Sequence, residues 1–198
     1  MPQDRQVEIR KKTRIFDDLF KIDELRVAHQ KSDGEMSAEQ RRLVFERGDS
    51  AAVFLLNTDS QCAIAVDQFR APTLGKGCAG GWVTETVAGT IERHETPEAT
   101  AIRETLEETG YKISHLQPIA RFFSSPGGTS ECVYLFYAEV RDADKIEKGG
   151  GNDAEGEDIQ VKYIPLDELF AMAKRASIED SKLLIGALWL SERMQHQP

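Results

Sequence analysis

The sequence predicts an α/β fold in which a mixed β-sheet lies between helices. Strand-like and helix-like patterns interleave along the chain, and several strands are separated only by short turns, which favours hairpins over a wholly parallel sheet. The 198 residues, 40% of them hydrophobic, can bury one substantial core and a small accessory unit. We therefore expect a main domain over residues 49–198 and a small N-terminal β-strand subdomain over residues 1–48.

The N-terminal stretch alternates polar and apolar residues in places and contains the turn sequence Ser32-Asp33-Gly34. It holds few large apolar side chains, so it is too thin to form a core of its own. We expect short strands here that pack on the main domain or on a second subunit.

The main domain begins with two apolar, β-rich runs, residues 51–57 and 62–69, and the short turn between them predicts a buried hairpin. A glycine-rich loop then leads to a strand at 82–89. The remaining expected elements are strands at 116–123, 132–140 and 159–166, helices at 96–109, 167–176 and 179–195, and loops at 124–131 and 147–158, the second acidic, glycine-rich and mobile.

The start and end of the first helix are marked clearly. Thr96 supplies a hydroxyl cap, Pro97 suits the first helical position, and Glu98 places a carboxylate in the first turn. Gly110 follows Thr109 and is the expected left-handed terminator.

Charge and cysteine content narrow the classes of partner and compartment. A formal net charge of −9 argues against nonspecific binding to nucleic acid or an anionic membrane, although an acidic excess alone usually reflects a solvated surface. The three cysteines are widely spaced and form no CxxC pair, which argues against a disulfide framework or a zinc site. No apolar run approaches the ~20 residues of a membrane span, so we expect a cytoplasmic protein.

The first helix carries an unusual concentration of carboxylates. Glu104, Glu107 and Glu108 share one helical face, and the Glu104–Glu108 spacing destabilises an isolated helix by ~0.2–0.5 kcal/mol. Arg103 reaches only Glu107 by helical spacing. Hard oxygen ligands of this kind suit Mg²⁺ or Mn²⁺, so a divalent cation explains the arrangement. Without a wider pattern, an acidic solvated face is the better explanation.

A wider pattern is present. The frame G-x5-E-x7-R-E-x-x-E-E-x-G starts at Gly89 and ends at Gly110. It resembles the Nudix box, the signature of hydrolases that cleave nucleoside diphosphates linked to another moiety. The resemblance implies a Nudix fold, an enzyme, and Mg²⁺ as cofactor with Mn²⁺ as a substitute. It also implies that Glu104 and Glu108 are the principal metal ligands and that Glu107 is a third or bridging ligand.

The same resemblance assigns roles around these ligands. The carbonyl of Ala88 would complete the coordination, and Arg103, counted with the catalytic residues, would orient the carboxylates together with Glu95. One position departs from the family pattern, because Thr105 stands where the family usually has an apolar residue. This departure concerns helix packing and touches no ligand.

In the family, a mobile loop after the box supplies the base that accepts a proton from the attacking water. The matching segment here is AEGED, residues 154–158. Its candidates are Glu155 as base and Glu157 as metal ligand or alternative base. A disordered acidic loop without a catalytic role is the alternative reading of its composition.

Four residues are predicted to bind substrate. Arg70 presents a planar fork to phosphate or ribose oxygens, and Glu85 lies in the approach to the box. Arg42 matches a position that in the family reaches the base from the partner subunit, although a solvated strand arginine is nearly as good an explanation. Glu131 closes the loop SPGGTSE and either contacts the sugar or caps the turn.

Two branches of the family resemble the chain beyond the box. VFERGDSAAV, DQFR and SPGGTSE look like the ADP-ribose pyrophosphatases, whereas KGGG, EGEDIQV and IEDSKLLIGALWL look equally like the GDP-mannose hydrolases. We expect ADP-ribose as substrate, giving AMP and ribose 5-phosphate, ahead of GDP-mannose. A non-catalytic sensor of nucleotide sugars is the alternative from another class. The resemblance also implies a homodimer that exchanges its N-terminal strands.

Overall fold

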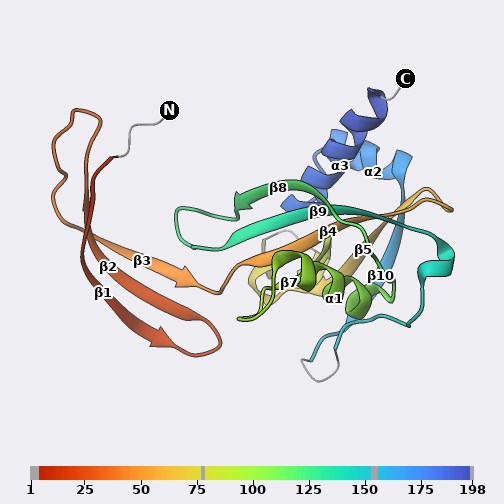
Figure 1. The fold of residues 1–198 in the computed structure, drawn as a ribbon, viewed down its shortest axis with the longest axis horizontal. Coiled ribbons are helices and arrows are strands. Elements are labelled where there is room, and N and C mark those ends of the chain that lie inside the picture. Colours follow the sequence, from red (N-terminus) through yellow and green to blue (C-terminus); the bar gives the residue numbers. More distant parts are fainter. Residues whose placement is uncertain (1–4, 77–78, 153–155, 197–198) are drawn as a thin grey trace. The chain divides into compact units, whose positions relative to one another are not determined.

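The computed structural model describes residues 5–76, 79–152 and 156–196 (Figure 1). The chain divides into two compact units. Unit 1 comprises residues 1–49 and 122–132, and unit 2 comprises residues 50–121 and 133–198. The sequence places residues 122–132 in the main domain. The structure groups them with the N-terminal strands, because the N–H of Phe45 donates to Gly128 and its carbonyl accepts from Ser130.

Unit 1 is built on an antiparallel three-stranded sheet in the order β1-β2-β3, formed by Val7–Asp17, Lys21–His29 and Gln40–Glu46. Its one deeply buried carboxylate among the described residues, Asp23, pairs with Arg14 at 2.5 Å and Lys12 at 2.9 Å. Hydrogen bonds from Arg14 and then Lys12 hold the pKa of Asp23 at about 2, below its ordinary value. Every residue of β1 is exposed.

Unit 2 is built on a mixed sheet in the order β10-β5-β4-β9-β8, with β6 paired to β5 and β7 paired to β4. The pairing of β4 with β9 is parallel, and β4 is antiparallel to β5 and β7. The strands are β4 Ser50–Asn57, β5 Cys62–Phe69, β6 Trp82–Glu85, β7 Val87–Thr90, β8 Gln117–Phe123, β9 Cys132–Val140 and β10 Ile159–Pro165.

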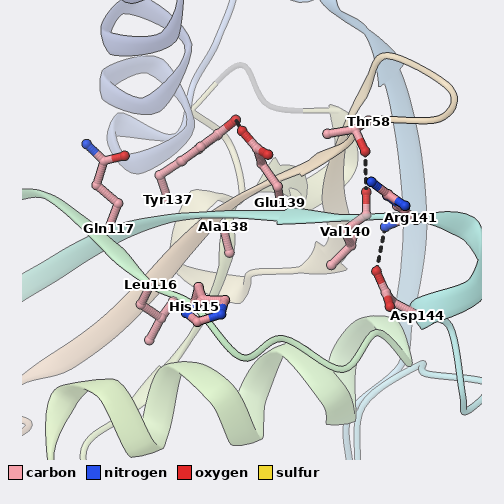
Figure 2. Close-up of a pocket in the computed structure, with 10 residues that line it drawn as sticks. All are labelled: Thr58, His115, Leu116, Gln117, Tyr137, Ala138, Glu139, Val140, Arg141 and Asp144. Carbon is pink, nitrogen blue, oxygen red and sulfur yellow. Dashed lines mark hydrogen bonds between the residues drawn. The ribbon is translucent and has the colours of Figure 1, made fainter.

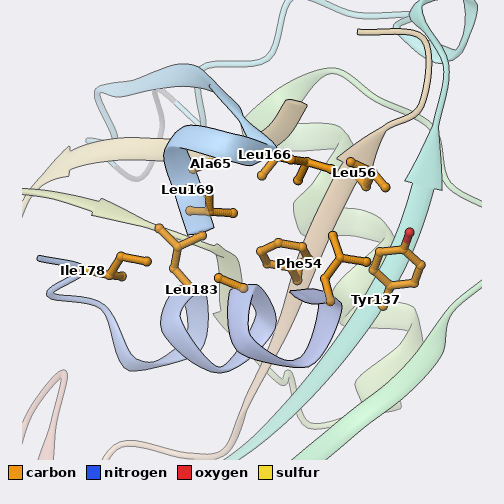
Figure 3. Close-up of a cluster of buried hydrophobic side chains, with 11 residues drawn as sticks. Phe54, Leu56, Ala65, Tyr137, Leu166, Leu169, Ile178 and Leu183 are labelled. Atoms are coloured by element: carbon orange, nitrogen blue, oxygen red, sulfur yellow. The ribbon is translucent and has the colours of Figure 1, made fainter. Parts of the chain in front are cut away.

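Helices cover both faces of this sheet, so the predicted mixed sheet between helices is confirmed (Figure 1). Alternate residues of β4 point into two different cores. Ala51, Val53 and Leu55 pack with Ala101 of α1. Phe54 and Leu56 pack with residues of α2 and α3 (Figure 3). All of β4 is therefore buried, as its uninterrupted apolar run predicts. The helices are α1 Pro97–Thr109, α2 Leu166–Lys174 and α3 Ser181–Gln195.

The strand expected at 82–89 is two strands. The ladder of β6 with β5 ends at Glu85 and that of β7 with β4 begins at Val87. Between them, the N–H of Thr86 donates to Asp180, the capping residue of α3, at 3.1 Å. The Asp180 carboxylate, far away in the sequence, thus accepts the hydrogen bond that a neighbouring strand would otherwise accept. A pattern of nearby residues cannot predict such a contact.

Part of the loop expected to be mobile is held against the end of α1. The N–H groups of Gly150 and Gly151 donate to the carbonyls of Glu108 and Glu107. A Cβ on Gly149 would lie 2.5 Å from the carbonyl carbon of Thr109, so this approach requires glycine. The loop satisfies carbonyls that the last turn of a helix leaves open. In the described part of the chain, no helix is long and apolar enough to cross a membrane.

A glycine also sets the distance between α3 and the sheet. A Cβ on Gly186 would lie 2.3 Å from the ring of Phe54. We expect Gly186→Ala to lower the free energy of unfolding, because overpacking costs about 1–3 kcal/mol and outweighs the helix-propensity gain of about 1 kcal/mol. Denaturant unfolding measures this. Gly127→Ala is the control, since its Cβ would meet nothing within 4 Å. Equal stability of the two variants would contradict the prediction.

Candidate active site

Helix α1 has the caps that the sequence predicts. Thr96 Oγ1 accepts from the N–H of Ala99 at 3.2 Å, Pro97 opens the helix, and Gly110 closes it in the left-handed region at φ 77°. The buried Thr105 hydroxyl donates to the carbonyl of Ala101 at 2.7 Å. This bond satisfies the polar atom at the position where the family prefers an apolar side chain.

Arg103 joins more carboxylates than helical spacing alone predicts. Its Nε and Nη2 donate to the two oxygens of Glu95 at 2.9 and 3.0 Å. Its Nη1 donates to Glu104 at 2.8 Å and to Glu107 at 3.0 Å. The hydrogen bonds from Arg103, followed by one from Thr100, lower the pKa of Glu95 to about 2. Arg103 therefore links Glu95 to two carboxylates of the cluster, Glu104 and Glu107.

Glu104 lies directly against β7. A Cβ on Gly89 would come within 1.7 Å of Glu104 Oε1, so only glycine leaves room for this carboxylate. Desolvation raises the pKa of Glu104 above its ordinary value, although Arg103 opposes the shift. The negative charges of Glu107 and Glu157 add to the rise. The carboxylates are thus close enough to act on one another.

Glu108 is the most deeply buried member, with 2% of its surface exposed. The backbone N–H of Ala88 acts to lower its pKa, while Oε2 has no hydrogen-bond partner in the described part of the molecule. Burial, followed by the charges of Glu104 and Glu157, raises the pKa of Glu108 well above its ordinary value. A buried carboxylate oxygen without a partner, beside other acids, destabilises the folded state unless a cation binds it.

These residues fit a divalent cation. Within the described ranges, no group of three or more acidic, histidine or cysteine side chains is arranged to hold a metal ion. Arg103 engages one oxygen each of Glu104 and Glu107. The open Oε2 of Glu108 and the space that Gly89 keeps for Glu104 nevertheless provide hard oxygen donors in a buried setting.

Of the two predicted loop bases, Glu157 lies in the described chain and Glu155 lies outside it. Glu157 Oε2 accepts from the N–H of Asn152 at 2.9 Å. A Cβ on Gly151 would lie 2.8 Å from that oxygen, so the glycine-rich loop packs closely on Glu157. The negative charge of Glu157 raises the pKa of both Glu104 and Glu108, so this acid lies near the carboxylate cluster.

Arg70 and Glu85 form an ion pair at the same site. Arg70 Nε donates to Glu85 Oε2 at 2.8 Å, and Nη2 lies 2.7 Å from the same oxygen. The positive charge of Arg70 opposes the rise in the pKa of Glu108. The structure therefore brings together the predicted residues of unit 2: Arg70, Glu85, Ala88, Glu95, Arg103, Glu104, Glu107, Glu108 and Glu157.

The other two predicted substrate residues belong to unit 1. Arg42 is exposed on β3 and donates to Gln40 and to the carbonyl of Arg41. Glu131 is buried, accepts from Ser124 Oγ at 2.8 Å and lies 3.7 Å from Arg47 Nη1. These contacts support the turn-capping alternative for Glu131.

Sequence reasoning missed two residues that shape the site. Asn152 positions Glu157 through its backbone, and Asp180 holds the β6–β7 junction. Asp180 precedes an apolar helical run and so carries the signal of a helix cap. Its second bond, to Thr86, has no local signal because the two residues are far apart in the chain.

A separate cavity of about 430 Å³ lies in unit 2, and Figure 2 draws the side chains that line it. It is shaped by segments around β8, β9 and the short 3₁₀ helix at Asp142–Asp144. None of the predicted site residues lines it. Its lining residues are Thr58, His115, Leu116, Gln117, Tyr137, Ala138, Glu139, Val140, Arg141 and Asp144. Size alone therefore does not identify the active site, and we base the assignment on chemistry.

Comparison with known proteins agrees with this chemistry. A sequence profile of the NUDIX domain matches residues 46–185. A GDP-mannose pyrophosphatase of Enterobacter sp. is 34% identical over 180 residues, covering 91% of this chain and 92% of the relative. Those of Escherichia coli O1:K1 and Citrobacter koseri are 32% identical over 192 residues and 37% identical over 145 residues. They cover 96% and 73% of this chain, and 98% and 74% of their own lengths.

The profile spans most of the chain and includes the complete frame from Gly89 to Gly110. Nudix hydrolases generally use divalent metal ions, which agrees with the donor set at Glu104 and Glu108. The chain therefore belongs to the Nudix family and is a Nudix pyrophosphatase.

Proposed function

We propose that this enzyme hydrolyses the pyrophosphate bond of nucleoside diphosphate sugars with Mg²⁺, and that GDP-mannose is its preferred substrate. The products are GMP and mannose 1-phosphate. The observation that carries the proposal is the buried Oε2 of Glu108, which lies beside Glu104 in a complete Nudix frame and has no partner among the described residues. A sensor without turnover would not need these acids, and none of them is replaced here.

The choice of GDP-mannose revises the order expected from the sequence. ADP-ribose came first there because VFERGDSAAV, DQFR and SPGGTSE look like the ADP-ribose branch. The relatives that align over nearly the whole chain are named GDP-mannose pyrophosphatases, and this favours the second substrate. ADP-ribose remains the second candidate.

Glu104 and Glu108 would hold the metal ion, with Glu107 as a third ligand and the carbonyl of Ala88 completing the set. When bound there, the ion would neutralise charge on the pyrophosphate and lower the pKa of the attacking water. Arg103 fixes the orientation of Glu104 and Glu107 through charge-assisted hydrogen bonds at 2.8 and 3.0 Å.

A base must also accept the proton of the attacking water. Glu157 Oε1 takes this role, because Oε2 is engaged by Asn152 and the acid lies close enough to influence Glu104 and Glu108. Glu155 is the alternative base. In either case the proton goes to a carboxylate of the loop that follows the box.

Arg70 binds the phosphates of the substrate. Its Nε and Nη2 are directed at Glu85, which fixes the plane of the guanidinium. Nη1 is the donor that Glu85 leaves available for a phosphate oxygen. The Arg70 side chain is 42% exposed, so a ligand can reach it.

The N-terminal sheet is the dimerisation element, and a second copy of the chain covers β1. Support comes from unit 1 itself, where Val7, Ile9 and Phe16 on β1 are each more than half exposed at 61%, 63% and 51%. Apolar strand residues left open in this way are typical of an interface. Through this dimer, Arg42 reaches the nucleotide base of the partner's substrate.

A competition assay tests the choice of substrate. Purified enzyme with Mg²⁺ receives equimolar GDP-mannose, ADP-ribose, ADP-glucose, NADH and a diadenosine polyphosphate, and each product is measured by chromatography. We expect GMP to form first and EDTA to stop all turnover. Faster release of AMP from ADP-ribose would make ADP-ribose the preferred substrate, as the sequence first suggested. Preference for the dinucleoside polyphosphate would contradict the assignment to enzymes that act on nucleoside diphosphate sugars.

A further inference from the structure

Asp180 makes three contacts from the N-terminus of α3. The residue is buried, and its Oδ2 accepts from the N–H of Leu183 at 3.0 Å and from the N–H of Thr86 at 3.1 Å. Its Oδ1 lies 2.6 Å from Lys182 Nζ. The first contact is an ordinary helix cap. The second ties the helix to a distant part of the sheet.

That part of the sheet is the junction between β6 and β7. Thr86 is buried, and the adjoining ladders include Glu85 and Val87 but not Thr86. A buried N–H without an acceptor destabilises the folded state. Asp180 supplies the acceptor that neither neighbouring strand supplies, and so it defines where β6 ends and β7 begins.

The junction separates two parts of the candidate active site. One residue before Thr86, Glu85 holds Arg70 at 2.8 Å. Two residues after it, the backbone N–H of Ala88 is near enough to Glu108 to act on its carboxylate. Gly89 follows and leaves the space that Glu104 fills. A shift at Thr86 would therefore move the surroundings of both principal ligands.

We infer that Asp180 is a positioning residue for the metal site. By holding the N–H of Thr86, it fixes Ala88 and Gly89 against Glu108 and Glu104, and this arrangement sets the affinity for the divalent cation. Lys182 balances its charge, so the carboxylate serves as a structural acceptor rather than a further ligand. The inference rests on the proposed metal-dependent function.

The backbone, and not the Thr86 side chain, makes the connection. Oγ1 of Thr86 is buried and has no hydrogen-bond partner among the described residues, whereas its N–H is bonded to Asp180. Thr86→Val keeps the N–H and the shape of the side chain while it removes the hydroxyl. It is therefore the matched control for any substitution at Asp180.

Mn²⁺ binding to substrate-free enzyme, followed by electron paramagnetic resonance, tests the inference. Asp180→Ser can still cap α3, because serine is a good N-cap, but it is too short to bond Thr86 as well. We expect it to weaken Mn²⁺ binding about 10-fold, measured well below its midpoint of thermal unfolding, which the loss of the Thr86 bond should lower slightly. Asp180→Asn keeps an acceptor oxygen and should bind Mn²⁺ nearly as tightly as the wild type, as should Thr86→Val.

Wild-type Mn²⁺ affinity in Asp180→Ser would overturn the inference, and so would a loss in Thr86→Val equal to that in Asp180→Ser. The proposed function is judged separately, by turnover of the wild-type enzyme. If the wild type hydrolysed no sugar nucleotide yet bound Mn²⁺ with the expected dependence on Asp180, the function would fail while the positioning role stood.

Discussion

Glu108→Gln is expected to lower kcat/KM for GDP-mannose by more than about 100-fold, beyond the usual cost of losing a residue that only supports a metal ligand. Glutamine keeps the size of the side chain. It loses the negative charge at the buried oxygen that has no protein partner in the described chain. Glu104→Gln should have a similar effect, because both acids hold the same cation.

The unfolding temperature of the Glu108→Gln variant shows whether it has lost its activity or its fold. Without added metal, Glu108→Gln should unfold at a temperature equal to or above that of the wild type, because a neutral amide replaces a carboxylate that burial disfavours. Glu98→Gln is the control: this acid lies exposed in the first turn of the same helix and should keep near wild-type kcat/KM. Full activity in Glu108→Gln would refute the metal-ligand assignment.

Gly89→Ala is expected to lower kcat/KM by about 10–100-fold, the range found when residues that orient metal ligands are changed. The new Cβ would lie 1.7 Å from Glu104 Oε1 and 2.0 Å from the carboxyl carbon, so the side chain must move away from β7. The displaced ligand should also raise the Mg²⁺ concentration needed for half-maximal rate. Steady-state kinetics over a Mg²⁺ series measures both effects.

A matched substitution shows whether the effect comes from this contact. A Cβ on Gly128 would meet nothing within 4 Å, so Gly128→Ala should leave the Mg²⁺ dependence unchanged. If Gly89→Ala kept the wild-type Mg²⁺ dependence, the contact between Glu104 and β7 would have no part in metal binding.

The features that could be predicted from sequence are those encoded locally. Helix α1 has the expected bounds because Thr96, Pro97 and Gly110 mark its ends within a few residues of the chain. The buried central strand follows from its apolar run, and the grouping of the three glutamates follows from helical spacing.

The features that could not be predicted depend on contacts between distant segments. Arg103 binds Glu95 because the loop before α1 returns to the helix, and spacing along the helix says nothing of that path. The break at Thr86 requires Asp180, and the binding of Gly150 to the end of α1 requires several glycines in left-handed conformations. Periodicity predicts which residues are buried on one element, but it does not predict which element covers them.

Product analysis of GDP-mannose hydrolysis tests whether metal ions held by Glu108 drive cleavage of the pyrophosphate. Wild-type enzyme and the Glu108→Gln variant are incubated with GDP-mannose, with Mg²⁺ or with EDTA, and phosphorus NMR identifies the products. We expect GMP and mannose 1-phosphate in equal amounts, formed by the wild type with Mg²⁺ and not in the other three reactions. Formation of GDP and free mannose, or equal product with and without the metal ion, would contradict it.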